Sequence, residues 1–172
     1  MTAFRQVGYF AMSTYGPLGV GMIQAANGDI QAGLQHLRDA VALAESAGFT
    51  FGLHRAQREA AEVELTLGEF TAARARLEPF VTAPDCETYN DITPMLPLLA
   101  WALLEAGEVA QAEILLERAA PQAVKQHHML ALLDVLRVRG MLCTRQGRWA
   151  EAQAALEDGL ARARGRHIPM PR

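Results

Sequence analysis

The 172-residue chain contains only two cysteines, Cys86 and Cys143, and neither belongs to a CxxC pair. We therefore expect two reduced thiols rather than a disulfide. Long apolar runs are also absent, because none reaches the ~18–20 residues needed to cross a bilayer. The N-terminal stretch lacks the basic end, apolar core and cleavage site of a secretory signal. Together these absences predict a cytoplasmic protein without membrane contact.

Sequence motifs that carry chemistry are scarce as well. The chain has no GxxxxGK[ST] phosphate loop, and its glycine-rich stretch 16–21 is apolar and lacks a following lysine. His127 and His128 are adjacent, so on a helix they would point about 100° apart and could not easily share a metal ion. We expect no metal, no cofactor and no enzymatic activity. A hydrolase or transferase that depends on His127 or Cys143 is the least favoured alternative.

The charge of the chain is close to balanced, with a formal net charge of −3. This value argues against direct binding to nucleic acid. Glu59 and Glu62 would share one helix face, as a carboxylate pair for acid–base work must. Arg55 and Arg58 each stand four residues before one of them, and this spacing favours ordinary ion pairs on a helix surface.

Four segments of the chain repeat one pattern: a glycine, a charged residue, an apolar residue, a small residue five positions after the glycine and a leucine nine after it. The glycines are Gly28, Gly68, Gly107 and Gly147. The small residues are Gly33, Ala73, Ala112 and Ala152, and the leucines are Leu37, Leu77, Leu116 and Leu156. The near-constant spacing of about 40 residues indicates tandem repeats.

Each part of this pattern has a mechanical explanation. A glycine directly after a helix can take the left-handed conformation that closes the helix end. A small residue lets two helices approach closely, and the leucine fills the space beside it. An apolar stretch with helical periodicity also precedes every glycine. Each unit is therefore predicted to be a helix, a tight turn and a second helix, and such hairpins must stack to cover their apolar faces.

The pattern resembles the tetratricopeptide repeat across residues 14 to about 164. The small residue expected midway along each first helix stands at Gly21, Ala61, Ala100 and Gly140. The aromatic residue usual three positions later is missing, and the period is longer than the family's usual one. The resemblance implies an all-α fold, a right-handed superhelix of stacked antiparallel helix pairs. It implies about four repeats, near 8–48, 50–83, 91–120 and 123–164.

The periodicity predicts eight helices, and two prolines mark expected irregularities. The ranges are 5–26, 30–47, 51–67, 70–82, 94–106, 109–120, 123–146 and 149–164. Pro17 predicts a kink or a late start in the first helix, and Pro121 predicts the end of the sixth. The segment 82–91 is rich in turn-forming residues and is predicted to be a loop.

The domain organisation predicted is a single repeat domain over 1–172, as a fragment of a larger protein. The stretch 136–164 resembles the repeat region behind the nucleotide-binding domain of bacterial signalling ATPases and transcriptional regulators. The alternative is a complete small repeat protein with a tail. We expect a module for protein–protein interaction or signal relay, and the alternative is a domain that senses a small-molecule or peptide effector.

Binding is expected on the concave surface that the first helix of each hairpin lines in the tetratricopeptide family. The turn glycines give the register, and they place nine residues there: Tyr15, Met22, Arg55, Arg58, Glu62, Trp101, Arg137, Met141 and Arg145. Arg137 and Arg145 are expected to be the freer cations, which suits an acidic peptide or an amphipathic helix. The alternative is that the two methionines and Trp101 are interhelix core and that the residues 55, 58 and 62 form a solvated face. Uncapped apolar ends would also allow a homodimer.

Overall fold

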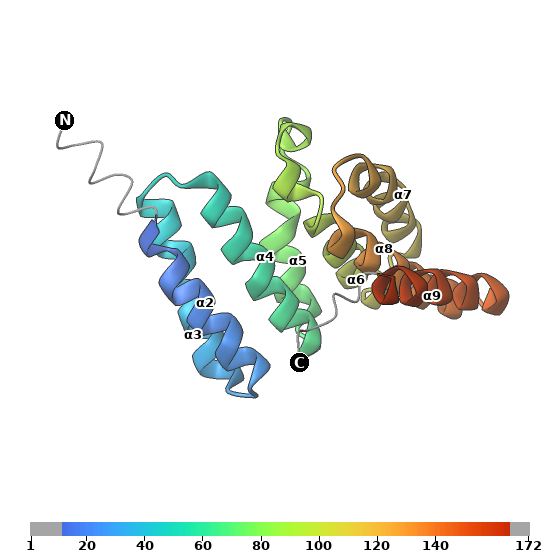
Figure 1. Cartoon of the computed structure of the whole chain (residues 1–172), viewed down its shortest axis with the longest axis horizontal. Helices are drawn as coiled ribbons and strands as arrows, with labels where there is room; N and C mark the ends of the chain where they lie inside the picture. Colours follow the sequence, from blue (N-terminus) through green and yellow to red (C-terminus); the bar gives the residue numbers. More distant parts are fainter. Residues whose placement is uncertain (1–11, 166–172) are drawn as a thin grey trace. The chain divides into compact units, whose positions relative to one another are not determined.

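The computed structural model describes residues 12–165, and this part of the chain is entirely helical, without a strand. The first four helices are α2 (Tyr15–Ala26), α3 (Ile30–Ser46), α4 (Thr50–Thr66) and α5 (Phe70–Val81). Two short 3₁₀ turns, Cys86–Thr88 and Asn90–Ile92, occupy the predicted loop. The remaining helices are α6 (Met95–Glu105), α7 (Val109–Lys125), α8 (Met129–Arg145) and α9 (Trp149–Arg164) (Figure 1).

The chain divides into two compact units of similar size, Met1–Cys86 and Glu87–Arg172. Within each unit every helix packs on the next one along the chain. The first and third helices of a unit also touch, α2 with α4 and α6 with α8. This sequential packing is consistent with an α-solenoid. None of the helices in residues 12–165 combines the length and the apolar character that a membrane span requires.

The helix ends confirm the predicted turns. Six residues with positive φ follow helices at 20-residue intervals within each unit: Gly28, Gly48 and Gly68, then Gly107, His127 and Gly147. At the first of these, the N–H of Gly28 donates to the Ala25 carbonyl at 3.1 Å, and the N–H of Asp29 donates to the Gln24 carbonyl at 2.9 Å. The other five turns repeat this pair of hydrogen bonds. The pair is the Schellman motif, which needs one left-handed residue.

His127 takes this left-handed position without being a glycine, at φ 54°. The next residue, His128, precedes α8, and its Nδ1 accepts a hydrogen bond of 3.2 Å from the backbone N–H of Ala131. His128 therefore satisfies one of the free N–H groups at the start of α8. Of the two adjacent histidines, His127 therefore closes the end of α7 and His128 caps the start of α8.

The small residues of the pattern lie between paired helices, as predicted. A Cβ at Gly33 would stand 2.8 Å from the backbone nitrogen of Ala25 and 2.9 Å from the carbonyl oxygen of Gly21, so α2 and α3 approach almost backbone to backbone. Ala73, Ala112 and Ala152 are likewise buried. These contacts hold the antiparallel pairs that Figure 1 shows for α2 and α3.

Leu156 differs from the other leucines of the pattern. The other three are buried, but Leu156 is 48% exposed. Its side chain still covers Gly140 of α8, where an added Cβ would meet it at 2.7 Å.

Pro121 does not end the sixth predicted helix, and this prediction was wrong. The helix α7 continues through it to Lys125, and α8 begins at Met129 rather than at 123. The ring removes one helical hydrogen bond, but the buried stripe continues through Ala119 and Ala123 and holds the last turn. Pro17 lies in the first turn of α2, where its missing N–H costs no helical bond. The predicted start of the first helix at residue 5 lies outside the described residues, so the kink or late start expected there stays a prediction.

Candidate binding surfaces

In the second unit, Glu87–Arg172 (unit 2; Met1–Cys86 is unit 1), the helices α6 and α8 are each the first helix of a hairpin. They bring three of the predicted residues together. Trp101 on α6 and Met141 on α8 each stand six residues before a turn glycine, so they hold the same position in consecutive repeats. The guanidinium carbon of Arg137 lies 4.5 Å from the centre of the Trp101 ring, within the range of a cation–π contact. A guanidinium nitrogen of Arg137 also lies 4.0 Å from the Met141 sulfur. We call Trp101, Arg137, Met141 and Arg145, with the carboxylates described next, the α6–α8 face.

Both arginines of this face are already paired, so the expectation that they are the freer cations was wrong. Arg137 donates to Asp134 at 3.2 Å, one turn away on the same helix. Arg145 donates to the Leu104 carbonyl at 2.6 Å and forms an ion pair with Glu105. Two guanidinium groups and two carboxylates leave the α6–α8 face without net charge.

The α6–α8 face is nevertheless open to solvent. The side chains of Arg137 and Arg145 are 38% and 42% exposed. Each ion pair is therefore partly hydrated and contributes at most about 1 kcal/mol to stability, which lets a partner compete for it. An aromatic ring, a thioether and paired charges on two rigid helices can bind a segment that is apolar on one side and polar at its edges.

Unit 1 brings together three other predicted residues around a smaller hollow. Met22 of α2 and Glu62 of α4 both line a cavity of about 270 Å³ between the two helices, with Ile30 and Val63. Arg58 pairs with Glu62 at 3.5 Å and also with the buried Glu59. Of the two predicted surface ion pairs, the one from 58 to 62 is thus present. The other is absent, because the buried Glu59 pairs with Arg58 and not with Arg55.

The remaining two predicted residues do not join this hollow. The ring of Tyr15 packs edge-on against Phe49 at 5.9 Å, and Tyr15 borders the core cluster around Leu18 and Leu37. Arg55 is exposed and has no hydrogen bond or ion pair with any residue of the described range 12–165. In unit 1 the structure therefore assembles the pair Met22 and Glu62 with Arg58, and leaves Tyr15 in the packing.

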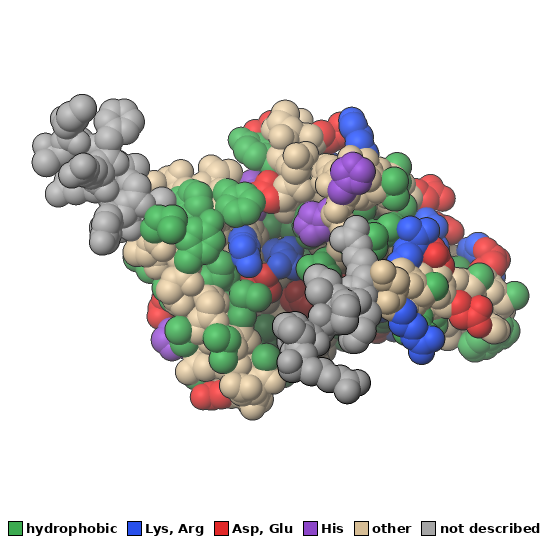
Figure 2. All heavy atoms as spheres, in the orientation of Figure 1, with side chains coloured by type: hydrophobic (Ala, Val, Ile, Leu, Met, Phe, Trp, Pro, Cys, Tyr) green, Lys and Arg blue, Asp and Glu red, His purple; other side chains and the backbone are tan. Residues whose placement is uncertain are grey.

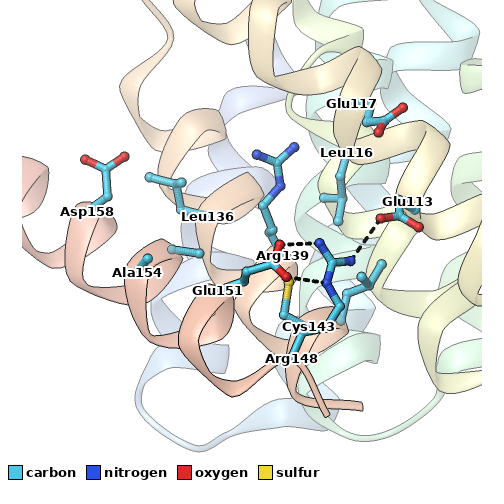
Figure 3. Close-up of a pocket in the computed structure, with 12 residues that line it drawn as sticks. Glu113, Leu116, Glu117, Leu136, Arg139, Cys143, Arg148, Glu151, Ala154 and Asp158 are labelled. Atoms are coloured by element: carbon cyan, nitrogen blue, oxygen red, sulfur yellow. Dashed lines mark hydrogen bonds and ion pairs between the residues drawn. The ribbon is translucent and has the colours of Figure 1, made fainter. Parts of the chain in front are cut away.

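A larger cavity lies in unit 2, where α7 and α9 flank α8 (Figure 3). Its volume is about 500 Å³, and we call it the α7–α9 cleft. Arg148, just before α9, bridges it by donating to Glu151 of α9 and to Glu113 of α7 at 3.4 Å. The hydrogen bond between Arg148 and Glu151 raises the pKa of Arg148 and lowers the pKa of Glu151, so both side chains stay charged at neutral pH.

Apolar side chains also reach the surface of each unit. Figure 2 shows them gathered over α2 and the beginning of α4, where Val20, Ile23 and Phe51 are 44–63% exposed. In unit 2, α9 exposes Trp149 and Leu160 at 67% and 50%. Where such residues form one contiguous patch, they mark a candidate surface for contact with another molecule.

Sequence reasoning missed the partners of the arginines and the whole α7–α9 cleft. Two signals were available for the partners. Asp134 stands three residues before Arg137, a helical ion-pair spacing. Glu105 stands one repeat period of 40 residues before Arg145, and the packing of α6 on α8 makes such positions neighbours. The cleft has no such signal, because its opening depends on which side chains leave space.

A comparison of the chain with protein-family models and with curated proteins returns no match. In residues 12–165 no group of three or more His, Cys, Asp or Glu side chains is arranged to hold a metal ion. Cys86 and Cys143 are both buried, and neither forms a disulfide in the part of the chain that the structure describes.

Proposed function

We propose that the chain is a binding module for another protein and that the α6–α8 face is its contact surface. The observation that carries this proposal is the Trp101–Arg137–Met141 cluster, because it gathers on one open face the residue types that dominate protein interfaces. The resemblance to tetratricopeptide repeats supports the same role. Since the face has no net charge, the best partner is an amphipathic helix with both acidic and basic side chains beside its apolar stripe.

The role within a cell follows from the second resemblance. A repeat module behind a nucleotide-binding domain would relay the binding of a partner to that domain, as in a bacterial signalling ATPase or transcriptional regulator. The proposal assigns the repeats no chemistry of their own. They would bind, and a linked domain would respond.

An array of helical peptides tests the contact surface. We expect peptides with an apolar stripe and mixed charges to bind the wild type, and the double variant Arg137→Glu, Arg145→Glu to lose them by at least about tenfold, since like charges would then face Asp134 and Glu105. The matched control is Arg55→Glu, which reverses an unpaired exposed arginine of unit 1. If the double variant and the control bind every peptide equally well, the α6–α8 face is not the contact surface.

A second candidate function is the sensing of a small effector. It is favoured by one observation, the α7–α9 cleft, whose volume of about 500 Å³ lies within the ~300–1,000 Å³ typical of small-molecule sites.

A further inference from the structure

The cleft of unit 2 has a counterpart in unit 1 that is filled by the protein itself. Eight residues after the turn glycine, α5 carries Arg76, and α9 carries Ala155 at the same position. Arg76 reaches across α4, where its Nε donates to Glu64 at 2.9 Å and its Nη1 to Gln57 at 2.6 Å. Only 17% of the Arg76 side chain is exposed, so in unit 1 this space holds a guanidinium group and its partners.

Unit 2 has different residues at each of these positions. Alanine replaces the arginine, and Cys143 and Leu136 stand where Glu64 and Gln57 stand relative to the turn glycine. Beside Ala155 the cleft is lined by the buried side chains of Leu116, Leu136 and Cys143, and charged side chains line the rest of it. An alanine in place of an arginine leaves a volume that an external molecule can take.

Two charged side chains of the cleft have no partner. Arg139 of α8 is half-buried and Glu117 of α7 is exposed, and neither forms a hydrogen bond or ion pair with any residue from 12 to 165. Arg139 stands where α4 has the fully buried Ala60, so the charge is specific to unit 2. Figure 3 shows the Arg139 guanidinium directed away from the ion pairs of Arg148, with Glu117 on the α7 side.

The other charged side chains of the cleft already have hydrogen-bond or ion-pair partners. Arg148 is held between Glu113 and Glu151, and Asp158 accepts a hydrogen bond of 2.8 Å from Arg162. A ligand thus meets one available cation and one available anion beside buried apolar side chains. A purely anionic ligand would face the carboxylate of Glu117, and a purely cationic one would face Arg139.

We propose that the α7–α9 cleft binds a small zwitterion with an apolar body, such as an apolar amino acid or a free dipeptide. The ligand carboxylate binds Arg139, which presents two parallel N–H groups to it. The ligand ammonium group binds Glu117, and the apolar side chains cover Leu116, Leu136 and Ala155. The α6–α8 face uses other residues of α8, so this site stands or falls independently of the proposed protein contact.

Titration calorimetry with leucine, the dipeptide Leu-Leu and two blocked forms of the dipeptide tests the assignment. We expect the wild type to bind at least one zwitterion. The C-terminal amide and the N-acetyl form of Leu-Leu should each bind at least about tenfold more weakly than Leu-Leu, because each lacks one charge. Leucine binding as tightly as Leu-Leu would assign the site to an amino acid, and weaker leucine binding would assign it to a peptide.

Two charge variants identify which group each end of the ligand meets. Arg139→Gln should lower the affinity for Leu-Leu about as much as amidation of the dipeptide does. The same variant should bind the amide no more weakly than the wild type does. Glu117→Gln should lower the affinity for Leu-Leu about as much as N-acetylation does, and it should bind the N-acetyl form no more weakly than the wild type does. A third variant, Ala154→Phe, fills the cleft from an exposed position of α9 and should abolish binding of all forms. Arg55→Gln in unit 1 is the matched control and should bind like the wild type.

Three results would overturn the proposal: no heat with any zwitterion, equal binding of the free and blocked dipeptides, or wild-type binding by Arg139→Gln. Thermal unfolding of each variant shows that it is folded under the conditions of the titration. Because the Arg139 side chain forms no hydrogen bond or ion pair with residues 12–165, its replacement by glutamine should change that unfolding little.

Discussion

At the scale of single residues, the turns between helices decide where each helix stops. Five of the six left-handed turn positions are glycine, which has no Cβ and takes positive φ without strain. The sixth is His127, whose side chain is exposed. An L-residue in this conformation costs about 1–2 kcal/mol relative to a right-handed one. His127 therefore weakens the turn between α7 and α8.

Exchanging the residues of two equivalent turns tests this interpretation. His127→Gly should raise the free energy of unfolding of unit 2 by about 0.5–1 kcal/mol, since the strain relieved exceeds the added entropy of the unfolded chain. Gly147→His, at φ 71°, should lower it by about 1 kcal/mol. Both changes are measured by urea denaturation. Equal stability of His127→Gly and the wild type would mean that the turn holds no strain.

The residue scale also shows what the sequence could and could not reveal. The four glycines of the repeat pattern were predicted correctly because a left-handed helix end has a local cause. His127 was not predicted as a turn residue, since histidine carries no such signal and Pro121 suggested an earlier stop. The same limit applies to Arg137 and Arg145, which are partly exposed but whose partners depend on the arrangement of the helices.

At the scale of helices, close approach between antiparallel partners explains the small residues. In α2 and α3 the two glycines Gly21 and Gly33 face each other's backbone. Periodicity predicted these positions well, because a helix must bury one stripe whatever it packs against. Periodicity could not predict that α7 passes through Pro121, because packing of Ala123 against Ala131 and Leu132 outweighs the lost hydrogen bond.

Two glycine-to-alanine changes in the first hairpin separate contact from propensity. Gly33→Ala should lower the free energy of unfolding by about 1–3 kcal/mol, because its Cβ would meet backbone atoms at 2.8 and 2.9 Å that cannot move aside cheaply. Gly19→Ala is the matched control on α2. It meets nothing within 4 Å and should stabilise the helix by about 0.5–1 kcal/mol. Two changes of the same sign would contradict the close packing of α2 on α3.

At the scale of the molecule, the two units share one plan and differ in what they leave open. Each has three left-handed turns, and in each the first and third helices meet. In unit 1, Arg76 fills the space that corresponds to the α7–α9 cleft, and a hollow of about 270 Å³ lies between α2 and α4. Unit 2 presents the α6–α8 face and the α7–α9 cleft. The repeat pattern was visible in the sequence, whereas these differences arise from side chains that only the fold places side by side.

The central claim is that unit 2 contacts a partner protein through the α6–α8 face. The most direct measurement is an NMR spectrum of the protein labelled at its methionine methyl groups, recorded while an amphipathic peptide from the array is added. Met141 reports on the α6–α8 face, Met22 on the unit 1 hollow and the buried Met95 on the core. The account predicts that the Met141 signal shifts with saturation, that Trp101→Ala abolishes the shift and that the Met95 signal stays in place. A titration in which the Met22 signal shifts while the Met141 signal stays where it is without peptide would contradict the account.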